Sequence, residues 1–139
     1  DGSLLASGGD DKNILLWNPE TGRRVRALQG HSGSVSAVTF QPGGTVLASG
    51  GADNTIRLWD VKSGHELKTL TGHERRVWGL SYNSDGSLLA SASADGTLRL
   101  WKPELITAEQ ACEIVVPHLP AEVLEEALKR APKACTELK

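Results

Sequence analysis

Short runs in which apolar and small polar residues alternate recur along the first 103 residues of the chain. Residues 35–40 alternate in this way, and residues 45–49, 55–60 and 66–70 form three further short runs. Alternation with a period of two is the pattern of a half-buried β-strand. Residues that favour turns, mainly Pro, Gly, Asp and Asn, separate the runs. The pattern predicts four short antiparallel strands joined by hairpins.

This pattern returns at a constant step along the chain. The stretch from Ser49 to Trp59 reads Ser-Gly-Gly-Ala-Asp-Asn-Thr-Ile-Arg-Leu-Trp, and related stretches end at equal distances before and after it, at Trp17 and Trp101. A Gly-His pair repeats with the same step at His31 and His73. A fixed period of roughly 40 residues indicates a repeat architecture. Four short antiparallel strands per repeat are typical of one blade of a β-propeller.

Counting strands by this repeat predicts ten of them. Residues 1–30 supply the second, third and fourth strands of a blade, residues 31–72 a whole blade, and residues 73–102 three strands of another. The total is about two and a half blades, whereas closed propellers have about four or more. Since the chain begins at a hairpin turn, we expect further blades upstream in a longer chain. The alternative is that copies of this chain complete a ring together.

The residues that mark each repeat resemble those of the WD-repeat (tryptophan–aspartate) β-propeller family. The resemblance rests on the Gly-His pair at His31, on Leu-Ala-Ser-Gly-Gly-Ala-Asp ending at Asp53, and on Ile-Arg-Leu-Trp-Asp ending at Asp60. It covers residues 1 to about 102. The other two copies end in Trp-Asn and Trp-Lys, so the closing aspartate is degenerate here. The resemblance implies a propeller fold that positions partner proteins.

The resemblance also implies a buried polar network in each blade. It joins a histidine before the first strand, a serine of the second strand, the aspartate of the tight turn and the tryptophan of the third strand. Carried onto this sequence, the network residues are His31, Ser49, Asp53 and Trp59; then His73, Ser91, Asp95 and Trp101; and, without a histidine, Ser7, Asp11 and Trp17. Donors and acceptors in such a set can all be satisfied. Because the set repeats with the blades, it indicates a fold determinant rather than a catalytic triad, which needs an exposed nucleophile.

By the same resemblance, partners dock on the rim that carries the Gly-His loops and the aspartate turns. The rim residues that we expect to contact partners are Ser34, Ser36, Arg75, Arg76, Trp78 and Asp10. Trp78 is the one tryptophan outside the repeat position, and an aromatic side chain flanked by charge is typical of an interface hot spot. The alternative is that Trp78 packs against a neighbouring blade.

Composition and charge narrow the classes of function. A net charge of −2 over 139 residues argues against binding nucleic acid or an acidic membrane through bulk charge. The small basic cluster of Arg23, Arg24 and Arg26 is expected to be solvated charge on an outer strand rather than a phosphate site. The sequence contains no signal peptide, no apolar run that could span a bilayer and no disulfide framework, so we expect a cytoplasmic protein. It shows no phosphate loop, metal cluster or activated nucleophile, so we expect no cofactor, no metal and no enzymatic activity.

The repeat stops after residue 103, and a helical pattern follows. Residues 107–110 form a capping box, and the predicted helix runs to about Val116, ahead of a proline. A second helix is predicted from Pro120, with apolar residues at helical spacing over 123–131. We expect this pair to cover the last blade or to dock on a partner. The possible zinc ligands of this region fit no compact site; they are Cys112, His118 and Cys135.

The sequence therefore predicts a mainly β, WD-repeat propeller portion over residues 1–103, with a short α-helical extension over residues 104–139. The expected function is that of a non-enzymatic scaffold whose rigid rim binds other proteins or peptides. One alternative is a regulatory or sensor module of a larger signalling protein, for example one with an ATPase domain. The other is a propeller unit completed by oligomerisation.

Overall fold

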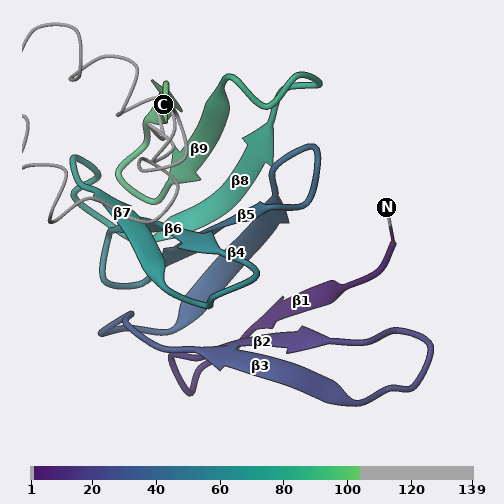
Figure 1. Ribbon diagram of the computed structural model, residues 1–139. Helices are drawn as coiled ribbons and strands as arrows, with labels where there is room; N and C mark the ends of the chain where they lie inside the picture. The colour runs from purple at the N-terminus through teal and green to yellow at the C-terminus, as the bar shows by residue number, and fades with distance from the viewer. Residues whose placement is uncertain (1, 104–139) are drawn as a thin grey trace, which may run out of the picture. The chain divides into compact units, whose positions relative to one another are not determined.

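The computed structural model describes residues 2–103, and these form three antiparallel sheets (Figure 1). The first sheet has the order β1-β2-β3, with bounds Leu5–Gly8, Ile14–Trp17 and Arg24–Leu28. The second has the order β4-β5-β6-β7, with bounds Val35–Phe40, Val46–Gly51, Ile56–Asp60 and Glu66–Leu70. The third has the order β8-β9-β10, with bounds Val77–Tyr82, Leu89–Ser93 and Leu98–Trp101.

The observed fold confirms the predicted mainly β class for the described residues. Its ten strands fall into sheets of three, four and three, as the sequence repeat predicts. Asp1–Pro103 forms one compact unit, and the boundary falls where the repeat ends in the sequence. The predicted helical extension, with Cys112, His118 and Cys135, lies outside the described residues. Within the described part of the chain, no helix is long and apolar enough to cross a membrane.

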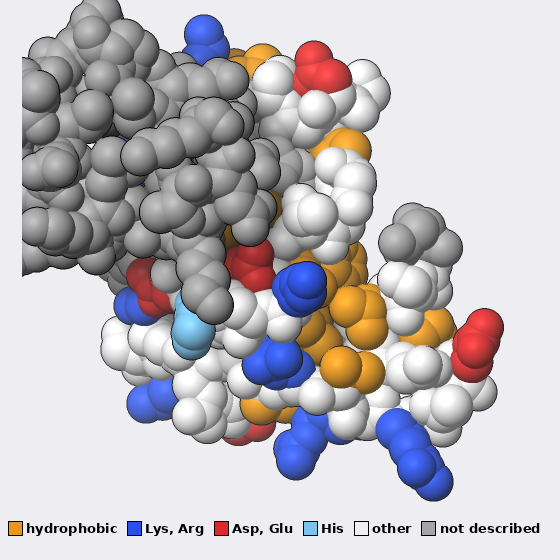
Figure 2. Space-filling view, viewed as in Figure 1, with side chains coloured by type: hydrophobic (Ala, Val, Ile, Leu, Met, Phe, Trp, Pro, Cys, Tyr) orange, Lys and Arg blue, Asp and Glu red, His pale blue; other side chains and the backbone are white. Residues whose placement is uncertain are grey.

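The apolar core lies where neighbouring sheets face each other. Side chains along a strand point alternately to the two faces of its sheet, so each strand sends one set toward the neighbouring sheet. Between the first and second sheets this set comprises Ile14, Leu16, Leu28, Val35, Leu47, Trp59 and Val61. Figure 2 shows hydrophobic side chains gathered over β1 and β2, with Lys and Arg side chains beside them. Burial of each large apolar side chain contributes about 1.5–3 kcal/mol, which holds the sheets together.

The sheets carry β-bulges at repeated positions. Ser36 is the additional residue between β4 and β5, and Trp78 takes the same place between β8 and β9. Val25 and Leu67 are the additional residues of the outer strands β3 and β7. A bulge leaves one residue out of the strand pairing and redirects its side chain. The bulges therefore set which side chains leave the sheet plane at each rim.

Polar contacts add to the packing between sheets. The guanidinium of Arg26 on β3 donates from Nη1 to the carbonyl of Ser63 at 2.9 Å and from Nη2 to that of Lys62 at 3.1 Å. Gln41 Nε2 donates to the carbonyl of Gly86 at 2.8 Å. Arg26 was expected to be simply solvated; although it is exposed, it binds the turn of the next sheet because its planar guanidinium matches two adjacent carbonyl groups.

Two glycines allow the sheets to approach closely. A Cβ atom at Gly8 would lie 2.6 Å from Cγ1 of Val35, and one at Gly50 would lie 2.6 Å from Cγ1 of Val77. Carbon atoms normally approach to about 3.5–4 Å, so neither position has room for a methyl group. Gly8 and Gly50 occupy equivalent places in successive repeats, and the close approach is therefore repeated at both contacts between sheets.

We expect the substitution Gly50→Ala to lower the free energy of unfolding by about 1–3 kcal/mol, because the new methyl group overpacks the contact with Val77. Denaturant unfolding measures this loss. In the double variant with Val77→Ala, the loss should be smaller than the sum of the two single losses. Gly79→Ala is the matched control, since its Cβ atom would meet only Ala92 Cβ at 3.8 Å. Equal stability of Gly50→Ala and the parent chain would contradict the close packing.

Candidate functional site

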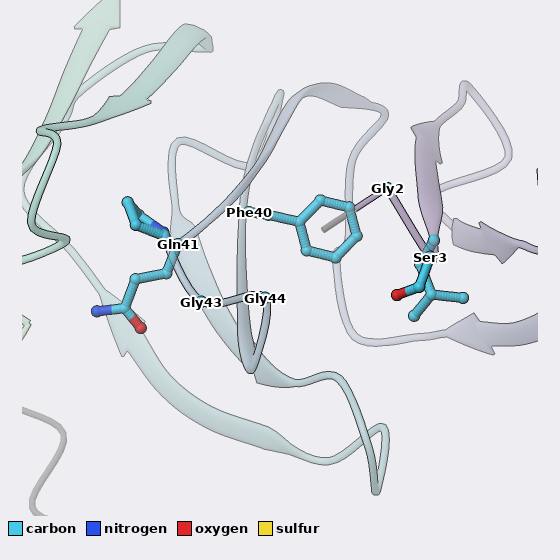
Figure 3. Close-up of a pocket in the computed structure, with 8 residues that line it drawn as sticks. Gly2, Ser3, Phe40, Gln41, Gly43 and Gly44 are labelled. Carbon is cyan, nitrogen blue, oxygen red and sulfur yellow. The ribbon is translucent and has the colours of Figure 1, made fainter.

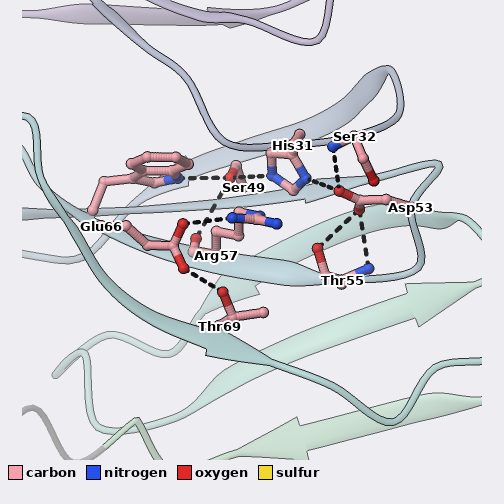
Figure 4. Close-up of polar contacts among 9 residues, drawn as sticks. His31, Ser32, Ser49, Asp53, Thr55, Arg57, Glu66 and Thr69 are labelled. Atoms are coloured by element: carbon pink, nitrogen blue, oxygen red, sulfur yellow. Dashed lines mark hydrogen bonds and ion pairs between the residues drawn. The ribbon is translucent and has the colours of Figure 1, made fainter.

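A chain of hydrogen bonds joins His31, Ser49, Asp53 and Trp59 in the second sheet (Figure 4). Trp59 Nε1 donates to Ser49 Oγ at 2.8 Å. Ser49 Oγ lies 2.7 Å from His31 Nε2, and His31 Nδ1 lies 2.8 Å from Asp53 Oδ2. A carboxylate only accepts, so Nδ1–H donates to Asp53, and the neutral imidazole accepts the Ser49 hydroxyl proton at Nε2. All three hydrogen bonds therefore run in one direction, from the indole to the carboxylate.

Asp53 also fixes the tight turn between β5 and β6. Its Oδ2 accepts from the backbone N–H of Ser32 at 3.0 Å, which anchors the loop that leads into β4. Its Oδ1 accepts from the backbone N–H of Thr55 at 3.2 Å and from Thr55 Oγ1 at 2.9 Å. A single carboxylate thus ties the histidine, the entry loop and the turn together at one rim of the sheet.

The protonation states of the network follow from burial and hydrogen bonding. Burial lowers the pKa of His31 below its ordinary value, and this effect outweighs the opposing influence of Asp53. Burial opposes the ionisation of Asp53, but hydrogen bonds donated by His31, Ser32 and Thr55 together lower the pKa of this carboxyl group. A neutral imidazole beside an ionised carboxylate is the pair that the hydrogen-bond directions require.

The third sheet repeats the arrangement. His73 Nδ1 lies 2.7 Å from Asp95 Oδ2, His73 Nε2 lies 2.7 Å from Ser91 Oγ, and Trp101 Nε1 donates to Ser91 Oγ at 2.8 Å. Thr97 Oγ1 donates to Asp95 Oδ1 at 2.6 Å. This bond, followed by those from His73 and the backbone, holds the pKa of Asp95 well below its usual range.

The first sheet carries only part of the network. Trp17 Nε1 donates to Ser7 Oγ at 2.9 Å, as its counterparts do. Asp11 instead accepts from Asn13, at 3.2 Å from the backbone N–H and at 3.0 Å from Nδ2, and it lies exposed. Without a histidine between them, Ser7 and Asp11 are not linked as Ser49 and Asp53 are. The structure therefore brings the predicted set together in the second and third sheets, and only the tryptophan–serine pair in the first.

The burial of the serine hydroxyl groups fits a structural role better than a catalytic one. The hydroxyl groups of Ser49 and Ser91 belong to buried residues, so a substrate cannot reach them. Among the described residues, no group of three or more His, Cys, Asp or Glu side chains could hold a metal ion.

The expected partner-binding residues lie at positions 34–36, at positions 75–78 and, in a separate turn, at Asp10. Arg76 and Trp78 stack, with the guanidinium carbon 4.7 Å from the indole centroid, and Trp78 is 57% exposed. Arg76 Nη2 donates to Ser34 Oγ at 2.7 Å, so it bridges the second and third sheets. Ser36, the bulged residue of β4, is half-buried, and Ser34 and Arg76 are also only half-exposed. We call Ser34, Arg76 and Trp78 the rim cluster.

The remaining two predicted rim residues are Arg75, which directly precedes Arg76, and Asp10. Arg75 is exposed, and its carbonyl accepts from Ser93 Oγ at 2.9 Å. Asp10 is exposed in the turn that follows β1 in the first sheet.

Sequence reasoning missed several residues that hold the rim. Thr55 and Thr97 complete the aspartate sites, and their recurrence at the step of the repeat is a signal that could have found them. Asn54 Nδ2 donates to the carbonyl of Glu74 at 3.1 Å and so joins the turn of the second sheet to the entry loop of the third. This contact depends on how the sheets pack, and the sequence carries no signal for it.

An ion pair also secures the outer strand of the second sheet. Arg57 Nη1 lies 2.5 Å from Glu66 Oε2, and Thr69 Oγ1 donates to the other oxygen of the same carboxylate (Figure 4). These bonds connect β6 to β7. They are partly solvated and so contribute little to stability.

A pocket lies between the segment before β1 and the turn after β4 (Figure 3). Its volume is about 270 Å³, and its lining is formed by Gly2, Ser3, Leu4, Phe40, Gln41, Pro42, Gly43 and Gly44. The ring of Phe40 points toward Gly2 and Ser3 (Figure 3). Among the described residues that line this pocket none is charged, and the amide of Gln41 is bound to the next sheet, so these residues offer little chemistry for recognition.

Comparison with known families agrees with this geometry. The family model described as "WD domain, G-beta repeat" matches residues 1–18, 22–60 and 64–102. This chain belongs to the WD40 repeat family. Each of the three matched segments ends one residue after the tryptophan of its sheet, at Trp17, Trp59 and Trp101, so the sequence repeat and the structural repeat coincide.

The WD40 chain is also similar to parts of several curated proteins. It is 46% identical over 43 residues to the nuclear distribution protein PAC1 of Coprinopsis cinerea, covering 31% of this chain and 10% of that protein. It is 43% identical over 42 residues to the U3 snoRNP-associated protein-like YAOH of Oryza sativa subsp. japonica, covering 30% and 8%. It is 40% identical over 42 residues to the transcription initiation factor TFIID subunit 5 of Caenorhabditis elegans, covering 30% and 6%. These matches extend over about one repeat and a tenth or less of each relative.

We expect Asp53→Ala to lower the free energy of unfolding by about 2–3 kcal/mol, because it leaves the buried Nδ1–H of His31 without an acceptor and removes the anchor of the Ser32 backbone N–H. The matched control is Asp11→Ala, which removes the equivalent carboxylate where it only caps a turn. The Asp11→Ala variant should lose clearly less free energy of unfolding than Asp53→Ala. Chemical denaturation measures both, and equal losses in the two variants would show that the histidine link contributes nothing.

The lowered pKa of His31 predicts a specific dependence of stability on pH. As pH falls below about 6.5, the unfolded chain binds a proton at this position before the folded chain does, so stability is lost. The lowered carboxyl pKa values of Asp53 and Asp95 add a further loss below about pH 4. The melting temperature should therefore decrease between pH 7.5 and pH 5, and less steeply in His31→Gln. The same slope in both proteins would contradict a neutral buried imidazole.

Proposed function

We propose that this WD40 chain is a docking platform for other proteins or peptides, and that the rim cluster is its contact site. The observation that carries the proposal is the exposure of Trp78, a large aromatic side chain that is held in place while most of its surface is open to solvent. Tryptophan and arginine dominate the residues that carry binding energy at protein interfaces. The chain would position its partners and would not transform them.

The rim cluster is arranged before any partner arrives. Trp78 is the bulged residue of β8, so its side chain leaves the regular strand pairing. Arg76 covers one side of the indole and is itself held by Ser34. A side chain that is already ordered loses less conformational entropy on binding. The free area of the indole is therefore available at a low entropic cost.

The two buried histidine–aspartate networks also hold the backbone that carries the rim cluster. The backbone of Ser34 accepts a hydrogen bond from the N–H of Ala52 at 2.8 Å, next to the turn that Asp53 fixes. On the neighbouring sheet, the N–H of Ala94 donates to the carbonyl of Arg76 at 2.9 Å, beside the turn that Asp95 fixes. Each half of the rim cluster is thus tied to one histidine–aspartate pair. This link explains why a rim built from loops can be rigid.

The relatives support a role in larger assemblies only in general terms. Their names describe a nuclear distribution protein, a snoRNP-associated protein and a TFIID subunit. Because one relative is named as RNP-associated, the expected absence of a nucleic-acid partner stays a prediction, as does the expected cytoplasmic location. The rim cluster is the feature of this chain that favours protein or peptide ligands.

Selection of a random peptide library on the chain tests the proposal. Selected peptides should bind the Trp78→Ala variant at least about 30-fold more weakly, since a hot-spot residue contributes about 2 kcal/mol or more. Leu67→Ala is the control, because Leu67 is also an exposed apolar residue at a bulge but lies on the outer strand. Peptides that bind both variants and the parent equally well would refute the assignment of the rim cluster.

A further inference from the structure

The loop that leads into β8 carries larger and more highly charged side chains than its counterpart before β4. Residues 74–78 read Glu-Arg-Arg-Val-Trp, whereas residues 32–36, one repeat earlier, read Ser-Gly-Ser-Val-Ser. In both loops the first residue donates its backbone N–H to the aspartate of the turn, at 3.0 Å to Asp53 and at 3.1 Å to Asp95. Small residues are therefore enough to build this loop, and its fold does not explain the charge and size of the later copy.

The guanidinium of Arg76 has hydrogen-bond donors to spare. Its Nη2 donates to the neutral hydroxyl group of Ser34 at 2.7 Å, and the described part of the chain offers its other N–H groups no carboxylate within ion-pair distance. Arg57 is also half-buried, but it has Glu66 at 2.5 Å. A planar guanidinium can bind both oxygens of one carboxylate, so a half-buried arginine without an anion is suited to receive one.

The acidic groups around the rim cluster do not fill this role. Asp53 and Asp95 each accept from a histidine, a threonine hydroxyl group and two backbone N–H groups. Their side chains are only 6% exposed, so their oxygens are engaged inside the fold. Glu74 and Arg75 are exposed neighbours of opposite charge. The positive charge of Arg76 is therefore the one left over at the rim cluster in the described part of the chain.

The position of Arg76 over the indole of Trp78 decides which charge a ligand can bring. Its guanidinium carbon lies 4.7 Å from the ring centroid, so a cation already occupies one face of the ring. A lysine or arginine of a partner would meet a like charge beside Trp78, which opposes binding. An apolar side chain meets no such charge, and it gains from covering the indole, which is 57% exposed.

We propose that the rim cluster recognises a peptide segment in which an aspartate or glutamate stands beside a large apolar residue. The carboxylate pairs with the N–H groups of Arg76 that Ser34 does not use, and the apolar side chain covers the exposed area of Trp78. Arg75, the adjacent residue in the chain, adds a second positive charge near the site. The inference rests on the proposed function, since it names the chemistry of the partner that docks there.

Peptides selected from the random library on the full 139-residue chain are the probe. They should be enriched in Asp or Glu next to an aromatic or large aliphatic residue. Exchange of that acid for its amide, Asn or Gln, should weaken binding to the parent chain about 10-fold, as expected for the loss of a hydrogen bond between charged groups. The same exchange should change binding to Arg76→Gln little, and Arg76→Lys should restore part of the preference because it keeps the charge. Isothermal titration calorimetry measures each affinity.

Arg24→Gln is the matched control, since it removes the same charge from an exposed position on the outer strand β3. It should leave the preference for the acid unchanged, and an equal loss in Arg24→Gln and Arg76→Gln overturns the inference, because bulk charge would then explain the preference. Peptides that require Trp78 but bind the parent equally well as acid and amide overturn the inference and leave the proposed function intact. That comparison uses the parent chain alone, so it does not depend on the folding of a variant. Peptides that bind Trp78→Ala as tightly as the parent refute both.

Discussion

The structure depends on a short chain of buried hydrogen bonds that starts at an indole and ends at a carboxylate. Trp59 lies on β6, Ser49 on β5, His31 before β4 and Asp53 in the turn between β5 and β6, so one chain of bonds joins four places in one sheet. Each donor has an acceptor, so the polar groups are buried without leaving one unpaired. Backbone groups of the entry loop and the turn end on the same aspartate, and the shape of the rim follows from this contact.

Packing between sheets is the second constraint, and it is directional. In each sheet, one face carries the tryptophan and the opposite face carries two apolar residues of the same strand. Where the first and second sheets meet, the apolar face of one packs against the tryptophan face of the other. Glycines at the closest approach set the spacing, since a methyl group at Gly50 would overlap Val77. Contacts of this type can be extended by another sheet, because the two ends of the array remain unlike. The rim cluster lies across one such junction, where Arg76 of the third sheet reaches Ser34 of the second.

Much of the fold could be predicted from the sequence, because the residues that specify each strand and turn are close together in the chain and recur in every repeat. The strand pattern, the turns and the tryptophan positions are each encoded three times in register. The strands of the second sheet fall at the predicted places, except that β5 and β6 each begin one residue later than expected and β5 extends two residues further. Asn54 adopts a φ of 67° in the tight turn, as turn chemistry favours. The same position holds Lys12 with a φ of 69° in the first sheet, where the repeat imposes a conformation that lysine alone would not favour.

What the sequence by itself determined was the repeat: the four-strand unit, its period, and the residue types able to form a satisfied polar network. The absence of a histidine from the first repeat can be read from the sequence, and only the tertiary structure decided that Asp11 binds Asn13 instead. It also decided that Arg26 binds the next sheet and that Arg76 binds Ser34. These contacts join different sheets, and their geometry follows from the spacing and twist of the packed faces. A periodic pattern specifies the unit, but it does not specify the distances between units.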